Sequence, residues 1–96
     1  MELIVDGREI QSESDLHRTL AESLDFGPFY GGNLAALRDR LTTDVPRPIS
    51  LVWRFSAESR QAMGSELFEK IKDLLVFVEE QDRKIGFKNR FTVRFE

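Results

Sequence analysis

Three short segments of the chain alternate apolar and polar residues with the period of about two that is typical of β-strands. They cover residues 2–6, 49–55 and 91–96. In the middle segment Ile49, Leu51, Trp53 and Phe55 share one face. The first and middle segments also carry the apolar residues Ile4 and Val52 on the opposite face. Strands that are apolar on both sides suit a sheet whose two faces are covered.

Between these segments the apolar residues recur every three or four positions, as they do in amphipathic helices. The first helix is predicted to start at Ser12 or Ser14 as N-cap, with Ser12-x-x-Asp15 fitting a capping box. Its predicted buried stripe contains Leu16, Leu20 and Leu24. A short helix is predicted from Ser56, as its cap, to about Gly64.

The longest helix is predicted over residues 65–83. Its sheet-facing side has six apolar residues: Leu67, Phe68, Ile71, Leu74, Leu75 and Val78. The opposite side carries Glu69, Asp73, Val76 and Glu80, with Phe77 on its flank. Most acidic stripes are solvated faces, but an exposed Val76 beside Phe77 would also suit a contact surface.

Strands separated by helical connections favour a parallel sheet. The sequence therefore predicts one domain, residues 1–96, with an α/β layer fold. This fold contains a three-stranded parallel sheet packed with about four helices.

Residues 26–33 form a turn-rich, aromatic loop that leads directly into a further helix. The loop contains three glycines and one proline, together with Phe29 and Tyr30, and Asn33 is the predicted N-cap. Leu34, Leu37 and Leu41 form the predicted buried stripe. Asp39 then faces solvent, with Ala35 one turn before it. The loop and helix are either an ordinary capped surface element or a recognition surface on a rigid scaffold.

The composition is that of a soluble globular protein, with 41% hydrophobic and 32% charged residues. No segment has the length and apolar character of a membrane span, and residues 1–6 lack a secretion signal. With no cysteine there is also no disulfide framework. We therefore expect a cytoplasmic protein without membrane contact.

The formal net charge of −3 disfavours nucleic acid as the main partner, since phosphate binding needs a concentrated positive field. It is compatible with a basic protein partner. The basic clusters are short, one with Arg38, Arg40 and Arg47 and another with Lys84, Lys88 and Arg90.

Residues for chemistry are scarce. His17 is the only histidine, so a histidine-rich metal site is excluded, and its place beside the apolar stripe suggests a structural role. No phosphate-binding glycine motif and no nucleophile elbow occur. We expect no catalytic residue, no cofactor and no metal, and therefore not an enzyme.

Several spaced motifs resemble the barstar-type ribonuclease inhibitors over nearly the whole chain. They are Asp6-Gly7-Arg8-Glu9-Ile10, Ser14-Asp15-Leu16-His17, Tyr30-Gly31-Gly32-Asn33-Leu34, Ala36-Leu37-x-Asp39-x-Leu41-Thr42, and then Pro48 and Trp53. The resemblance implies a protein that blocks the active site of a small secreted ribonuclease. Asp39 matches the family's phosphate-mimicking aspartate.

The resemblance also implies the other partner-binding residues. Asn33 and Leu34 match helix-entry positions at the interface, and Phe29 stands where the family has a tyrosine. Glu80, or Glu79 as the alternative, matches the acidic residue of the last helix, and Phe77 falls at an apolar contact position. The predicted set is completed by Tyr30, Gly31, Ala35, Arg38 and Thr42.

The sequence departs from the family pattern near Asp39. Ala35 replaces an aspartate, while Arg38 and Asp44 replace tryptophans. Arg38 and Arg40 flank Asp39 and weaken the negative field that would steer a basic partner. The alternatives are therefore a module against a different toxin or a nucleic-acid-binding module. The oligomeric state stays open, because an edge strand could pair two copies.

Overall fold

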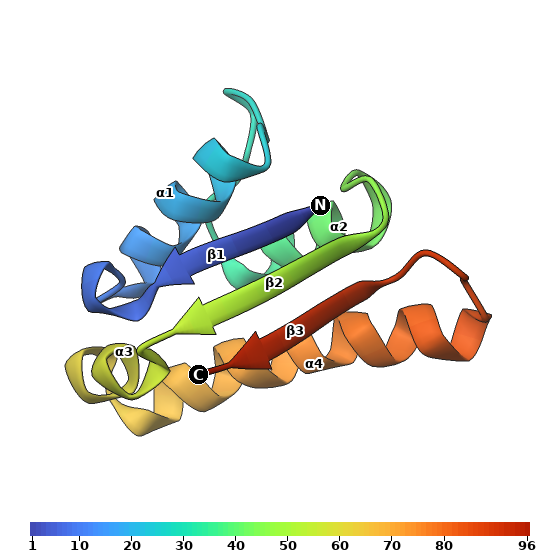
Figure 1. Ribbon diagram of the computed structural model, residues 1–96. Coiled ribbons are helices and arrows are strands. Elements are labelled where there is room, and N and C mark those ends of the chain that lie inside the picture. The colour runs from blue at the N-terminus through green and yellow to red at the C-terminus, as the bar shows by residue number, and fades with distance from the viewer.

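The computed structural model describes residues 1–96 and contains a three-stranded parallel sheet of order β1-β2-β3 (Figure 1). The strands are β1 (Glu2–Asp6), β2 (Ile49–Arg54) and β3 (Phe91–Phe95). The helices are α1 (Glu13–Ser23), α2 (Leu34–Thr43), α3 (Ser56–Met63) and α4 (Ser65–Ile85), with a 3-10 turn η1 (Gly7–Glu9) after β1. The predicted α/β fold with a three-stranded parallel sheet and four helices is confirmed.

Helices α2 and α4 lie behind the sheet in Figure 1, and its other face is open. On the open face Ile4, Val52 and Arg94 are neighbours across the three strands, and Ile4 is 55% exposed. The prediction of a sheet covered on both faces is therefore wrong. Val52 is buried because it lies in the central strand between the side chains of Ile4 and Arg94.

The turn between β2 and α3 is tighter than predicted. Phe55 has left-handed backbone angles (φ 53°) and an exposed ring, so it leaves the strand and the shared inner face. Ser56 is the first helical residue and not the cap; its Oγ donates a hydrogen bond to the Glu96 carbonyl oxygen (3.0 Å). The strand thus passes into the helix through one residue. A Cβ on Gly7 would lie 2.2 Å from the Phe55 carbonyl oxygen, so only glycine fits at that position.

The ends of α1 and α4 follow local signals. Ser12 is the N-cap of α1, and its Oγ accepts a hydrogen bond from the Asp15 amide (3.1 Å). The Asp15 carboxylate accepts from the Gln11 amide (2.9 Å), one residue earlier than in a reciprocal capping box. Helix α4 extends to Ile85, two residues beyond the predicted end, and Gly86 terminates it in the left-handed conformation (φ 85°).

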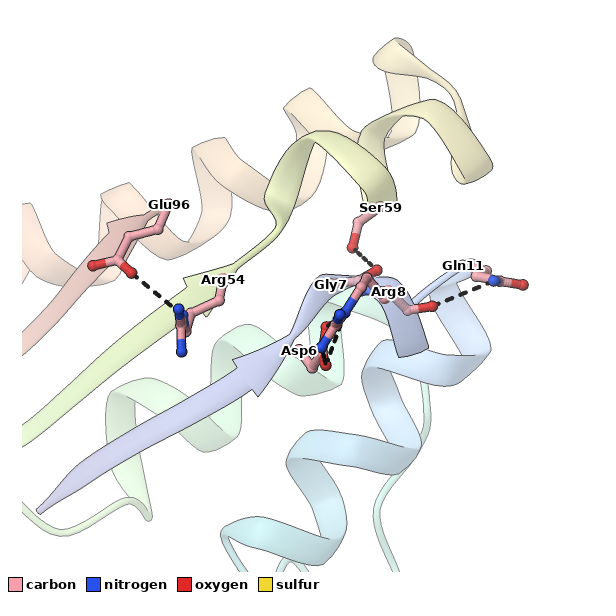
Figure 2. A network of polar contacts seen from close by, with 7 residues as sticks. All are labelled: Asp6, Gly7, Arg8, Gln11, Arg54, Ser59 and Glu96. Carbon is pink, nitrogen blue, oxygen red and sulfur yellow. Dashed lines mark hydrogen bonds and ion pairs between the residues drawn. The ribbon is translucent and has the colours of Figure 1, made fainter.

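The core lies between the sheet and the helices, where Trp53 is fully buried against Phe68 and Phe95. The Trp53 indole N–H donates to Ser59 Oγ (3.1 Å), and that hydroxyl donates to the Gly7 carbonyl oxygen (2.7 Å; Figure 2). This chain of hydrogen bonds ties α3 to the end of β1 inside the core. No helix is both long enough and apolar enough to cross a bilayer.

Candidate partner-binding surface

Helix α2 presents Asp39 to solvent. Asn33 caps the helix by accepting the Ala36 amide at its Oδ1 (2.8 Å), as predicted. Leu37 and Leu41 are completely buried on the inner side, while Asp39 is exposed on the outer side. The apolar stripe therefore fixes the direction in which the carboxylate points.

The Asp39 carboxylate makes no hydrogen bond and no ion pair within the chain, because both flanking arginines are held elsewhere. Arg40 donates to the Phe26 carbonyl oxygen (2.8 Å) and faces the Asp44 carboxylate (3.6 Å). The guanidinium of Arg38 lies over the ring of Phe77, with Cζ 4.3 Å from the ring centre. Asp39 thus keeps its full capacity to accept hydrogen bonds from another molecule.

The aromatic loop before α2 is anchored by Tyr30. Its hydroxyl lies 2.6 Å from Nδ1 of the buried His17, whose Nε2 lies 2.9 Å from the Glu13 carboxylate. Burial of the hydroxyl, with a smaller contribution from Glu13, raises the pKa of Tyr30 to about 12. The Tyr30 ring also packs on Phe26, with the ring centres 4.8 Å apart. Tyr30 therefore holds the loop against α1 with its hydroxyl turned inward. His17 has a structural role, since it connects this hydroxyl to Glu13.

The neighbouring residues of the loop and of α2 are on the outside. Phe29 is 91% exposed, and Gly31 is exposed beside the side chain of Ala36. Leu34 is half-buried against the core, while Ala35 and Thr42 are exposed on α2. The Thr42 hydroxyl donates back to the Arg38 carbonyl oxygen (2.8 Å). These positions form one continuous stretch of chain from the loop onto the outer side of α2.

Helix α4 adds a second side to this surface, since Arg38 of α2 rests on its Phe77. Phe77 is 40% exposed, whereas Val76 is less exposed, so the predicted apolar exposure belongs mainly to Phe77. Glu80 forms an ion pair with Arg83 next to Phe77. Glu79 points to the sheet and accepts the Val93 amide (3.3 Å). Of the two candidate acids, Glu80 is the one that lies on the Phe77 surface.

The sequence reasoning missed a buried ion pair between Arg47 and Asp82, with Nε 2.7 Å from Oδ2. Asp82 also accepts the Phe91 amide (2.7 Å). A signal was present, because Asp82 continues the buried stripe of α4 through Leu75 and Val78, where a carboxylate needs a partner. Arg47 therefore does not belong to a free basic patch. No group of three or more acidic or histidine side chains is arranged to hold a metal ion.

Comparison with known proteins identifies the family of this chain. The family model described as "Barstar (barnase inhibitor)" matches residues 1–94. A protein of Bacillus subtilis (strain 168), named "Putative ribonuclease inhibitor YrdF", is 34% identical over 94 residues, which cover 98% of this chain and 97% of the relative. The sequence motifs, the fold and these matches together show that the chain belongs to the barstar family.

Proposed function

We propose that this protein inhibits a small secreted ribonuclease by inserting the Asp39 carboxylate into the enzyme's phosphate-binding pocket. The observation that carries the proposal is the free Asp39 side chain, exposed on a helix whose leucines are buried in the core. A ribonuclease must bind phosphate with cationic donors, and a carboxylate can accept charge-assisted hydrogen bonds from the same groups. The inhibitor itself needs no catalytic group or cofactor.

Rigidity supports the same role. The Asn33 cap, the buried leucines and the Tyr30 anchor hold the loop and α2 in one geometry. A preorganised carboxylate loses little conformational entropy on binding, which favours tight inhibition. Phe29, at 91% exposure, offers an apolar side chain on the loop before α2. Family membership supports inhibition as the function, and the Bacillus subtilis relative carries the name "Putative ribonuclease inhibitor YrdF".

Barnase, the enzyme named in the family description, is a suitable probe. We expect Asp39→Ala to weaken binding to barnase at least a hundredfold in calorimetric titration, and to abolish inhibition of RNA cleavage. The melting temperature should stay nearly unchanged, because Asp39 has no partner within the chain. Glu22→Ala, at an exposed position of α1, is the matched control and should bind as the wild type does. Equal binding by Asp39→Ala and the wild type would contradict the phosphate-mimic mechanism.

An immunity role against another type of toxin is the second candidate. It is favoured by Arg38, whose guanidinium lies over Phe77 without an ion pair and is unsuited to a uniformly basic target. A pull-down with the wild type and Asp39→Ala side by side, followed by activity assays on the captured protein, separates these targets. Recovery of a ribonuclease by the wild type alone supports the first candidate.

A further inference from the structure

The surface where α2 meets α4 carries two unpaired cations. The Arg38 guanidinium rests on the ring of Phe77 and makes no ion pair. Lys84 lies two turns further along α4, is exposed, and also has no acidic partner. Cations without an intramolecular partner, placed beside a binding surface, are available to a ligand.

A shallow groove lies next to these cations. It has a volume of about 250 Å³ and is lined by Phe77, Glu80, Gln81, Lys84 and Ile85. Phe77 is 40% and Ile85 59% exposed, so the groove offers two apolar side chains. The one carboxylate in it, Glu80, is neutralised by Arg83. The groove therefore combines apolar walls with positive charge.

The unpaired charges of α4 lie before and after Phe77 along the helix. Asp73, one turn before Phe77 on α4, is exposed and unpaired, as is Asp39 on α2. Arg38 lies over Phe77 itself, and Lys84 lies beyond it. A partner complementary to this surface needs basic groups against Asp39 and Asp73, and an acidic group against Arg38 and Lys84.

We infer that Arg38 and Lys84 determine the specificity of this inhibitor: they select a target that carries an acidic side chain at the rim of its cationic active site. This inference rests on the proposed function, since it concerns the same partner. The side chain of a partner glutamate or aspartate enters the groove, and its carboxylate faces the two cations. A target that is basic at this rim is repelled.

Association with barnase tests the inference, because a ribonuclease binds phosphate with cationic groups and the two cations oppose them. The variants are Arg38→Glu and Lys84→Glu; Arg38→Gln removes the charge without reversing it. The control is Arg94→Glu, the same charge reversal at an exposed arginine of β3, which is paired with Glu96. Rates and affinities are measured by surface plasmon resonance at low salt and at 0.5 M salt, on the order of several times physiological ionic strength.

We expect Arg38→Glu and Lys84→Glu each to bind barnase at least tenfold more tightly than the wild type, mainly through faster association at low salt. Arg38→Gln should lie between them and the wild type, and Arg94→Glu should change the affinity less than threefold. Lys84 does not stack on Phe77, so Lys84→Glu reports the effect of charge on affinity without the loss of a packing contact. High salt should reduce the differences.

Two results would overturn the inference. One is an affinity of Arg38→Glu and Lys84→Glu no higher than that of Arg94→Glu. The other is absence of barnase binding by the Arg38→Glu/Lys84→Glu double variant. Asp39→Ala in the Arg38→Glu background keeps the two proposals apart: if Asp39 is needed but Arg38 and Lys84 have no effect, inhibition stands and the specificity assignment fails. If Asp39→Ala does not weaken binding in this background, the proposed function fails.

Discussion

Arg47 and Asp82 form an ion pair whose side chains are only 14% and 5% exposed, and which joins the segment before β2 to the last turns of α4. Asp82 also holds the Phe91 amide at the start of β3. We expect Asp82→Ala to lower the free energy of unfolding by about 3–5 kcal/mol, since removing one partner leaves a buried charge uncompensated. Urea denaturation measures the loss, and Asp73→Ala, at an exposed and unpaired position, is the control.

The same pair makes stability depend on pH. Burial opposes ionisation of Asp82, but the hydrogen bonds from Arg47 and Phe91 outweigh it and lower its pKa. A lowered pKa in the folded state means that the contribution is present above the unfolded pKa of about 4 and is lost as the pH falls below it. The difference in unfolding free energy between the wild type and Asp82→Asn should therefore shrink from pH 7 to pH 3. A difference that stays constant over this range would argue against the pair.

Ser59 connects the core of the sheet to α3. Its hydroxyl is fully buried, accepts the Trp53 indole N–H and donates to Gly7. Ser59→Ala leaves both groups without a partner and should cost about 2–4 kcal/mol. Denaturation followed by the fluorescence of Trp53, the only tryptophan, measures this loss. Ser14→Ala, at an exposed position of α1, should stay within about 0.5 kcal/mol of the wild type.

Tyr30 and Phe29 are adjacent, but substituting Tyr30 should affect mainly stability, whereas substituting Phe29 should affect mainly binding. Tyr30→Phe removes the hydroxyl next to buried His17 Nδ1 and should destabilise the protein by about 1–3 kcal/mol in thermal or urea unfolding. Phe29→Ala should leave stability within about 0.5 kcal/mol, because the ring is 91% exposed, while weakening the binding of barnase. Loss of stability in Phe29→Ala with unchanged binding would mean that the two roles have been exchanged.

Glu79 and Glu80 are neighbours with different surroundings. Glu79 accepts the Val93 amide at the outer edge of the sheet and so covers part of an edge strand. We expect Glu79→Ala to speed hydrogen exchange of the Val93 amide several-fold and to leave barnase affinity unchanged. Glu80→Ala should weaken the binding of barnase and leave hydrogen exchange of the Val93 amide unchanged. Identical effects of the two variants on binding would contradict the assignment of Glu80 to the partner surface.

Much of the fold could be predicted because local patterns report local geometry. The alternation in β1 and β3 and the leucine spacing of α2 predicted elements close to those observed. Asn33 was correctly predicted as a cap, since its bond to Ala36 spans three residues. The outward direction of Asp39 followed from the same helical period, and the barstar resemblance followed from motifs that keep their spacing.

Other features depend on residues far apart in the chain. Arg47 meets Asp82 across 35 residues, and Arg38 meets Phe77 only because α2 packs beside α4. The open face of the sheet was not predicted, because the apolar character of a residue such as Ile4 does not indicate whether a helix covers its side chain. Likewise, the sequence could not distinguish Glu79 from Glu80, because only the packing of β3 beside Glu79 separates their roles.

The sequence by itself determined the elements and the exposed carboxylate, because each depends on neighbours within one or two turns. It also determined the family, through motifs that keep their spacing along the chain. Only the tertiary structure decided that this carboxylate is unpaired. Arg38 and Arg40 could have neutralised Asp39, and they do not because Phe77, Phe26 and Asp44 hold them elsewhere. Which charged groups stay unpaired on the surface depends on the contacts that the other charged groups make. Those contacts join segments that are far apart in the sequence.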